Sequence, residues 1–354
     1  MKHEILRFEA VSFSDLPGWE QDDHAAALQA FLKSSSNFVK GQSKDPLALL
    51  CREAEANAGH SVKARVFFET HFKPHRVVHQ EPHGLVTGYY EPVLPGSRVR
   101  EGQFQIPVYR RPPDLVNVVD DSLRASAGEN LTHARRLADG TLVPYPTRQE
   151  IESGALAGQG FELMYLADPV DTFFMHVQGS GMIELPDGSC VRLSYDGKNG
   201  HPYTSIGRHL IETGVFKAEN VTLDALVDWL RANPEKAREV MWKNASFVFF
   251  RELTGEEAYS PLGANEIPLT PGRSLAVDAS IHTLGTPVYV VAPTLTHTDG
   301  GKSFQRLMIA QDVGSAIRGS ERGDIFFGTG SEAGRQAGMT KHPANFFVLL
   351  PRYG

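Results

Sequence analysis

Three aspartates near the end of the chain have the residue type and placement for acid–base chemistry. Asp278 and Asp312 each end a short apolar run, and Asp324 begins one between Gly323 and Gly328. A carboxyl group beside apolar residues loses hydration, which raises its pKa towards the range of a general acid. The three aspartates are therefore candidates for catalysis.

Two other interpretations of these aspartates are a structural role in turns and the active site of an aspartic peptidase. Each aspartate can cap a turn or pair with Arg318 or Arg322, and for a single aspartate this structural role is the more common one. The sequence Asp312-Val313-Gly314-Ser315 also resembles an aspartic protease loop. That chemistry needs a second equivalent loop, and Asp278-Ala279-Ser280 lacks the glycine. A peptidase is therefore disfavoured, while capping and catalysis stay open.

Other motifs that carry chemistry are incomplete. The glycines of 328–334 have the spacing G-x-G-x-x-x-G, which is not the dinucleotide fingerprint. Ser180 lies in Gly179-Ser180-Gly181, short of the G-x-S-x-G nucleophile elbow. The fourteen histidines contain no His-Glu-x-x-His. We therefore expect neither a metal site nor a cofactor.

The end of the chain reads as a succession of short strands. Apolar runs rich in β-branched and aromatic residues alternate with glycine or proline, a pattern typical of a small closed barrel. The expected strands are Phe247–Arg251, Ser274–Val277, Val288–Val291, Leu307–Ala310, Ile325–Phe327 and Phe346–Leu350.

The rest of the chain has a different pattern of predicted helices and strands. The first seventy residues are predicted to be helical, with an apolar stripe through Leu47, Leu50 and Ala54. Between about 98 and 245 the pattern is mixed: strands are expected at Gln105–Tyr109 and Thr172–Val177. Helices are expected after two cap signals, the capping box Thr147-x-x-Glu150 and Thr222 before Leu223–Ala232.

This order predicts one domain interrupted by another. A chain of 354 residues exceeds the roughly 250–300 residues at which single cores stop growing. We expect a discontinuous domain from 1–97 plus 246–354, helical at its start and containing the barrel. Residues 98–245 would form an inserted, smaller β-rich domain. The expected class is mainly β with peripheral helices.

Charge and hydropathy exclude several classes of function. The net charge of −7 lacks the basic footprint of a nucleic-acid-binding protein. No apolar run approaches the roughly 18 residues that cross a bilayer, and Met1–Arg7 lacks the apolar core of a secretory signal. Cys51 and Cys190 are distant, so we favour isolated core thiols over a disulfide, which stays open.

Ordered blocks along the chain resemble the membrane-bound lytic transglycosylase A family. The resemblance runs from about residue 84 to the C-terminus, and the helical first seventy residues carry little of it. The matching blocks are Thr87–Pro92 (TGYYEP), Phe174–Gly181 (FMHVQGSG), Gly197–Gly200 (GKNG), Asn244–Phe250 (NASFVFF), Pro271–Asp278 (PGRSLAVD) and Gln311–Gly319 (QDVGSAIRG), followed by Asp324.

The resemblance implies a fold and an activity. Family members have a double-psi β-barrel interrupted by a second small β-barrel-like domain, with the glycan in a groove between the two. They are peptidoglycan lytic exotransglycosylases that cut the β-1,4 bond between N-acetylmuramic acid and N-acetylglucosamine without water. The C6 hydroxyl of muramic acid attacks its own C1 and leaves a 1,6-anhydro ring.

The resemblance also assigns roles to residues. Asp324 matches the catalytic acid/base and Asp312 its partner, while Asp278 completes the three aspartates that name the 3D domain. By the same comparison, six residues would contact the glycan: Thr87, Tyr89, Tyr90, Gln178, Ser180 and, with a structural role as the alternative, Asp278. Because the hydroxyl that attacks is part of the substrate, one carboxyl group can act first as acid and then as base.

The implied partners are peptidoglycan strands and other proteins of cell-wall synthesis or hydrolysis. The family is commonly exported and lipid-anchored, which implies the cell envelope, in the periplasm at the outer membrane. This sequence shows neither a signal peptide nor a lipobox, so the anchor is unsupported. A non-catalytic peptidoglycan-binding scaffold with the same groove is the alternative function.

Overall fold

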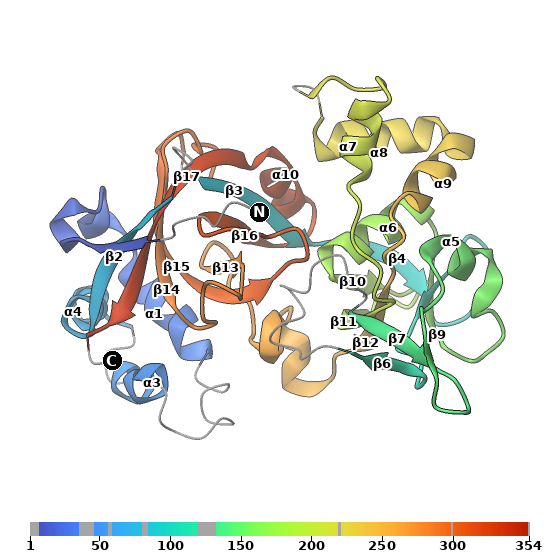
Figure 1. The fold of residues 1–354 in the computed structure, drawn as a ribbon, viewed down its shortest axis with the longest axis horizontal. Helices are drawn as coiled ribbons and strands as arrows, with labels where there is room; N and C mark the ends of the chain where they lie inside the picture. Colours follow the sequence, from blue (N-terminus) through green and yellow to red (C-terminus); the bar gives the residue numbers. More distant parts are fainter. Residues whose placement is uncertain are drawn as a thin grey trace. The chain divides into compact units, whose positions relative to one another are not determined.

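The computed structural model describes residues 7–34, 46–55, 59–79, 84–118, 132–218, 221–298 and 300–352. The chain divides into two compact units, each of which is described by itself (Figure 1). Unit 1 comprises Met1–Tyr89, Leu262–Gly328 and Thr340–Gly354, and unit 2 comprises Tyr90–Pro261 and Thr329–Met339. The expected insertion, 98–245, lies wholly within unit 2, which also takes in residues on both sides of it and the short segment after Gly328.

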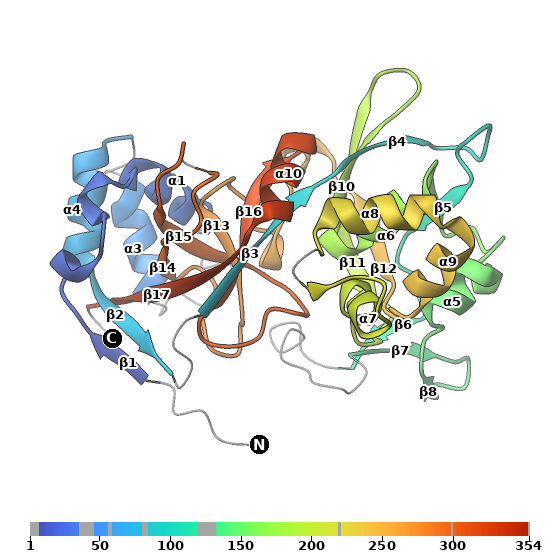
Figure 2. The same ribbon diagram turned by 90° about the horizontal axis from the view of Figure 1, so that it is seen from above.

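Unit 1 contains a closed ring of six strands (Figures 1 and 2). The order is β3-β16-β13-β15-β14-β17, and β17 pairs back with β3. The six strands are β3 (Gly84–Glu91), β13 (Ser274–Val277), β14 (Pro287–Ala292), β15 (Phe304–Val313), β16 (Arg322–Thr329) and β17 (Lys341–Pro351). Strands β13 and β14 are buried at every residue, as expected of strands covered on both faces.

The ring confirms the closed barrel but corrects one of its expected members. Phe247–Arg251 does form a strand, β12 (Val248–Glu252), but this strand belongs to the sheet of unit 2. The sixth barrel strand is β3, from far earlier in the chain. An apolar pattern predicts a strand but not the neighbouring strand with which it pairs, because the backbone hydrogen bonds that join strands do not depend on residue type.

Helices cover one side of the barrel, as predicted for the first seventy residues, although Arg7–Ala10 forms a strand instead. They are α1 (His24–Lys33), α3 (Pro46–Glu55) and α4 (Ser61–His71), followed by β2 (Phe72–Val78), which pairs with β17 and with the edge strand β1 (Arg7–Ala10). Four buried phenylalanines form a cluster of ring contacts that packs on β14, β15 and β17; they are Phe31, Phe67, Phe68 and Phe72.

Unit 2 combines a six-stranded sheet, a three-stranded sheet and several helices. The larger sheet has the order β12-β11-β10-β4-β9-β5 and the smaller one β6-β7-β8. The strands that accompany β12 are β4 (Val93–Ser97), β5 (Ile106–Tyr109), β6 (Leu115–Asn117), β7 (His133–Arg136), β8 (Leu142–Val143), β9 (Glu162–Leu166), β10 (Ser180–Glu184) and β11 (Cys190–Lys198). The helices are α5 (Arg148–Glu150), α6 (Pro169–Gln178), α7 (Ile206–Glu212), α8 (Leu223–Ala232), α9 (Pro234–Trp242) and α10 (Ser331–Met339).

Both cap signals act as expected in unit 2. Thr147 and Glu150 form the capping box of α5, and the side chain of Thr222 caps α8. The expected strand Thr172–Val177 is wrong, because these residues lie in α6. Asp168 accepts a hydrogen bond from the N–H of Val170 at the start of this helix, and Pro169 occupies its first turn. These start signals outweigh the strand preference of the aromatic and β-branched residues that follow.

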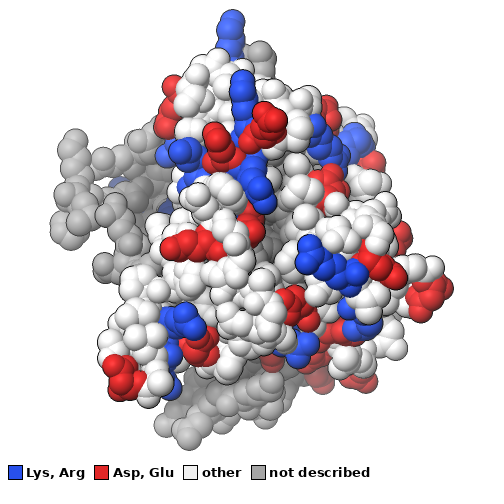
Figure 3. All heavy atoms as spheres, turned by 90° about the vertical axis from the view of Figure 1, so that its right-hand side faces the viewer, with Lys and Arg blue, Asp and Glu red and all other residues white. Residues whose placement is uncertain are grey.

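Charged side chains of both signs are interspersed among neutral ones on the face that Figure 3 shows, and several acidic and basic groups lie next to one another. Exposed ion pairs such as Arg98–Glu252 join opposite charges. Cys51 and Cys190 form no disulfide with each other: Cys51 is buried in α3, as expected of a core thiol, but Cys190 is exposed at the start of β11, so that expectation is wrong for Cys190. Among the helices of the described ranges, none combines the length and apolar character that crossing a membrane requires.

Candidate active site

The barrel places Asp312 and Asp324 on either side of one small residue. Strand β13 runs parallel to β15, which sets Ala276 opposite Asp312. It runs antiparallel to β16, which sets Ala276 opposite Asp324. Residues that pair across strands share a face of the sheet. The two carboxyl groups therefore start from the same level and the same face, although they lie on strands that are not adjacent.

Strand β3 supplies a hydroxyl group to each carboxyl group. Thr87 and Tyr89 are two residues apart and so point to one face of the strand. Thr87 Oγ1 donates to Asp324 Oδ1 over 2.6 Å, and the Tyr89 hydroxyl donates to Asp312 Oδ2 over 2.8 Å. The ring of Tyr89 also contacts that of Phe326 at 5.3 Å between centroids.

A short loop adds a backbone donor to Asp312. The N–H groups of Ala264 and Val313 donate to Asp312 Oδ1 over 3.1 and 2.8 Å. Gly263 has no room for a side chain, because a Cβ atom would lie 2.5 Å from the carbonyl oxygen of Gln311. The next residues, Asn265 and Glu266, have φ of 56° and 61°, in the left-handed region. This loop was not predicted from the sequence, since a backbone donor leaves no signature in residue type.

Both carboxyl groups titrate far above an ordinary aspartate. Burial raises the pKa of Asp324 to about 6, opposed by the Thr87 hydrogen bond and the positive charge of Arg322. Burial likewise raises the pKa of Asp312 to about 6, opposed by its three donors and reinforced by the charge of Asp324. The pKa of Tyr89 also rises well above its usual value because of burial and Asp312. The pair can therefore hold a proton near neutral pH.

Asp278, the third predicted aspartate, accepts hydrogen bonds within a turn and from the loop at Gly319. It is 4% exposed, and its Oδ1 accepts from the N–H and hydroxyl of Ser280 over 3.1 and 2.6 Å. Its Oδ2 accepts from the N–H of Gly319 over 3.0 Å, and Arg318 lies 3.9 Å away. These contacts match the turn-capping alternative. In the described ranges, no group of three or more His, Cys, Asp or Glu is arranged to hold a metal ion.

The remaining predicted residues, Tyr90, Gln178 and Ser180, lie in unit 2. Gln178 is the last residue of α6, and its Oε1 accepts from the N–H of Tyr90 over 3.1 Å. Gly179 ends the helix with φ of 83°, so that Ser180 begins β10. The Tyr90 ring packs on α10 at Gly334, where a Cβ atom would lie 2.8 Å from the ring. The structure thus joins Tyr90 and Gln178 by a direct hydrogen bond.

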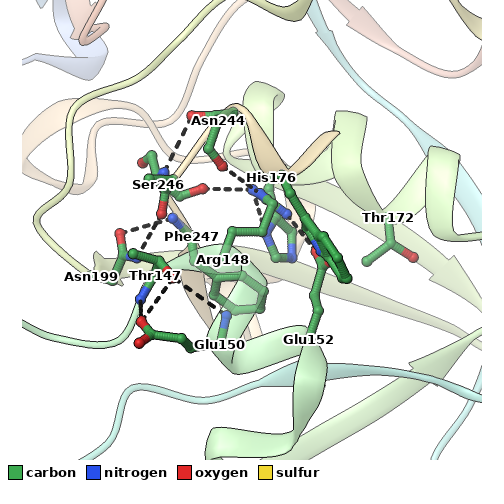
Figure 4. A network of polar contacts seen from close by, with 12 residues as sticks. Thr147, Arg148, Glu150, Glu152, Thr172, His176, Asn199, Asn244, Ser246 and Phe247 are labelled. Carbon is green, nitrogen blue, oxygen red and sulfur yellow. Dashed lines mark hydrogen bonds and ion pairs between the residues drawn. The ribbon is translucent and has the colours of Figure 1, made fainter. Parts of the chain in front are cut away.

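A second polar network in unit 2 centres on Arg148 (Figure 4). Its guanidinium is 1% exposed and donates to the carbonyl oxygens of Asn244 and Ser246 over 3.1 and 2.7 Å, and to Glu152 over 3.0 Å. It also contacts His176 Nδ1 at 3.4 Å, on α6. Burial lowers the pKa values of both Arg148 and His176. The network ties α5 and α6 to the segment that leads into β12.

Two long segments of the chain match known protein families. Residues 85–251 match the profile of the MltA specific insert domain, and residues 273–350 match that of the 3D domain. Membrane-bound lytic murein transglycosylase A of Escherichia coli K12 is 38% identical over 268 residues, and that of Vibrio cholerae is 37% identical over 264. These matches span 74% and 73% of this chain but only 64% and 63% of the relatives, less than two thirds of their length.

Solved structures agree with the sequence matches. The membrane-bound lytic murein transglycosylase from Agrobacterium tumefaciens has a TM-score of 0.88 and 38% identity, covering 98% of each chain. E. coli MltA with bound chitohexaose has a TM-score of 0.69 and 30% identity, covering 98% of this chain and 91% of that one. The family resemblance of the sequence is thereby confirmed, and the chain belongs to the membrane-bound lytic murein transglycosylase A family.

Proposed function

We propose that this protein is a lytic transglycosylase that cleaves peptidoglycan between N-acetylmuramic acid and N-acetylglucosamine without water. The observation that carries the proposal is the Asp312–Asp324 pair, in which both pKa values rise to about 6. A general acid is most effective when its pKa lies near the working pH. Family membership supports the same reaction.

The two aspartates differ in how many donors they accept, and this difference assigns their roles. Asp312 accepts three hydrogen bonds, from Tyr89, Val313 and Ala264, which favour its ionised form. Asp324 accepts one, from Thr87. We therefore assign the role of acid to Asp324, whose neutral form is opposed by fewer donors. The carboxylate of Asp312 disfavours a second negative charge nearby and helps to keep that proton in place.

In the first step, Asp324 gives its proton to the glycosidic oxygen. The bond from this oxygen to C1 of muramic acid breaks, and N-acetylglucosamine leaves with a free hydroxyl. Positive charge develops on C1 and the ring oxygen, and the ionised carboxyl groups stabilise it. Asp324 is now a carboxylate, held by the hydroxyl of Thr87.

In the second step, the C6 hydroxyl of the same muramic acid attacks C1. Its proton passes to the Asp324 carboxylate, which restores the starting enzyme, and a 1,6-anhydro ring forms. The nucleophile is already tethered, and a tethered group reacts with a large effective molarity. This is why a second carboxylate that attacks or activates water, as in glycoside hydrolases, is dispensable.

Substrate contacts are proposed for five residues in addition to the acid pair. Hydroxyl and amide groups would bind the sugar hydroxyl and N-acetyl groups, and the tyrosine rings would cover apolar sugar faces. These residues are Thr87, Tyr89, Tyr90, Gln178 and Ser180. The related E. coli MltA has been crystallised with bound chitohexaose, which supports a glycan ligand. For Asp278 we propose the structural role that its turn contacts support.

The substrate would place the working enzyme in the cell envelope. The curated relatives are described as membrane-bound, and a position at the outer membrane, facing the periplasm, fits both this description and the location of peptidoglycan. Other proteins of cell-wall synthesis or hydrolysis are the partners expected there.

The experiment is a digest of purified sacculi followed by mass spectrometry of the released muropeptides. Products with 1,6-anhydromuramic acid, one water lighter than reducing ends, are expected from the wild type and are absent with Asp324→Asn. Reducing ends would show a hydrolase and overturn the mechanism. Glycan binding by both proteins, with no product from either, would show a non-catalytic scaffold instead.

A further inference from the structure

Arg322 lies two residues before the proposed acid and reaches it through Thr87. One guanidinium nitrogen of Arg322 donates to Thr87 Oγ1 over 2.9 Å, and the other donates to the carbonyl oxygen of Gly323. Thr87 Oγ1 in turn donates to Asp324 Oδ1 over 2.6 Å. The three side chains therefore form a chain of two consecutive hydrogen bonds that ends on the carboxyl group.

The direction of this chain is set by the chemistry of its first member. A guanidinium group can only donate, and it stays protonated in proteins. A threonine hydroxyl has one proton and two lone pairs. Thr87 Oγ1 accepts from Arg322 with one lone pair, which turns the other side of the hydroxyl group towards Asp324, and its proton points to Asp324 Oδ1. This oxygen then acts as an acceptor, so a proton on Asp324 resides on Oδ2.

We propose that Arg322 is a positioning residue that fixes the Thr87 proton on Asp324 Oδ1 and thereby reserves Oδ2 for proton delivery and recovery. This inference rests on the proposed function. Without Arg322, the Thr87 hydroxyl can rotate more easily and accept a hydrogen bond from a protonated Oδ1, which creates a second, unproductive arrangement. Arg322 also favours the carboxylate that forms after the first step, because opposite charges attract.

The positive charge of Arg322 opposes the rise that burial causes in the pKa of Asp324. The titratable groups that interact with Asp324 are Asp312, Tyr89 and Arg322. Asp312 and Tyr89 become negative or stay neutral, so neither can stabilise a carboxylate by charge. Arg322 is itself partly buried, and its charge acts across the Thr87 hydroxyl rather than through an exposed ion pair. Charges shielded from water are screened less by salt.

The test compares Arg322→Met with the wild type across pH, on purified sacculi. Loss of the cation should move the basic limb of the kcat/KM profile upward by about 0.5–1 pH unit, since an opposite charge near a carboxyl group lowers its pKa. The maximal kcat should fall about tenfold, a part of what general acid catalysis contributes. Arg322→Lys, which retains the charge, should restore most of the pH profile and only part of kcat.

Thr87 variants test whether Arg322 acts through the hydroxyl. Thr87→Val removes the relay and Thr87→Ser keeps it. If the relay is correct, Arg322→Met in the Thr87→Val background lowers kcat by no more than about twofold further, because both changes break the same chain. Arg318→Met removes a cation from the same loop, where it lies 3.9 Å from Asp278, and should leave the profile unchanged.

An NMR titration of ¹³C-labelled aspartate separates this inference from the proposed function. The signal of Asp324 is assigned by its loss in Asp324→Asn, and its midpoint should rise in Arg322→Met, whether or not the protein turns over. Thermal melting shows which variants are folded. An unmoved midpoint and pH limb, or fully additive Arg322 and Thr87 effects on kcat, would overturn the relay. Absence of anhydro products from the wild type would overturn the function alone.

Discussion

Glu91 in unit 2 and the Asp312–Asp324 pair in unit 1 are buried carboxyl groups whose charge is compensated in different ways, although unit 1 also contains a buried guanidinium pair, Arg273–Asp22. In unit 2, Glu91 is fully buried and pairs with Arg192, which is 7% exposed and donates from Nε over 2.9 and 3.1 Å to both carboxylate oxygens. In unit 1, the groups that donate directly to Asp312 and Asp324 are neutral: the hydroxyls of Thr87 and Tyr89 and two backbone N–H groups.

This difference distinguishes a carboxylate that stabilises the fold through an ion pair from carboxyl groups that can exchange a proton. Burial also raises the pKa of Glu91, but the hydrogen bond from Thr329 and the positive charge of Arg192 oppose the rise. Breaking such a buried pair is costly. Neutral donors offset less of the cost of burial, so the pKa values of Asp312 and Asp324 stay near 6 and a proton can be exchanged. Arg148 is a buried cation with a structural role of the same kind, since its guanidinium donates to carbonyl oxygens and to Glu152 (Figure 4).

The largest expected effect is on turnover. Asp324→Asn should lower kcat on sacculi by about a thousandfold, within the range that general acid–base catalysis contributes. Asp312→Asn should lower it less, because the amide oxygen can still accept from the two backbone N–H groups, while the charge and the second acceptor oxygen are lost. Release of anhydromuropeptides measures both, with circular dichroism as the check on folding. More than a tenth of wild-type activity in Asp324→Asn would transfer the role of acid to Asp312.

The next effect is on stability, in unit 2. Arg192→Met should lower the free energy of unfolding by about 3–5 kcal/mol near pH 7.5, because it leaves Glu91 buried without its cation. The loss should shrink towards pH 5, as Glu91 takes up a proton. Denaturant unfolding measures both values.

The matched control for that variant is Arg98→Met. Arg98 pairs with Glu252 at the surface, with side-chain exposures of 51% and 27%, and exposed pairs contribute about 0–1 kcal/mol. Equal losses for the two variants would show that burial of the pair has no special weight.

A smaller effect of opposite sign is expected in unit 1. The raised pKa of Asp324 means that the folded state disfavours its carboxylate. The resulting cost to stability is absent below the ordinary pKa of about 4, grows as the pH rises and is complete above about 6. Asp324→Asn should therefore stabilise the protein by about 1–2 kcal/mol at pH 7.5 and by almost nothing at pH 4. Thermal melts at the two pH values check this, and equal changes at both would contradict it.

The smallest effect concerns Asp278. Asp278→Asn keeps one acceptor oxygen and loses the other, which should cost about 1 kcal/mol of stability for the weakened turn. KM for sacculi should stay within twofold of the wild type, because the proposed role of Asp278 is structural. A rise in KM without a change in stability would restore Asp278 to the substrate contacts.

Local features were predictable from the sequence where the signal is itself local. The four residues Ser274–Val277 are all apolar or small, and they form β13 with the expected bounds. The capping box Thr147–Glu150 needs only residues three apart, and it forms. The prediction failed at Thr172–Val177, where strand-prone residue types lie inside a helix started by Asp168 and Pro169. Residue type is a weak preference that neighbouring start signals override.

The amino-acid sequence by itself determined which carboxyl groups were candidates, which runs after residue 246 become strands and to which family the chain belongs. Only the tertiary structure decided what those carboxyl groups touch. Thr87 and Asp324 are 237 positions apart in the sequence and are joined by one hydrogen bond. Asp278 instead accepts a hydrogen bond from Ser280, two residues later. The physical reason is that burial and partners, which set a pKa, arise when distant strands pair, and pairing through backbone groups is not written in residue type.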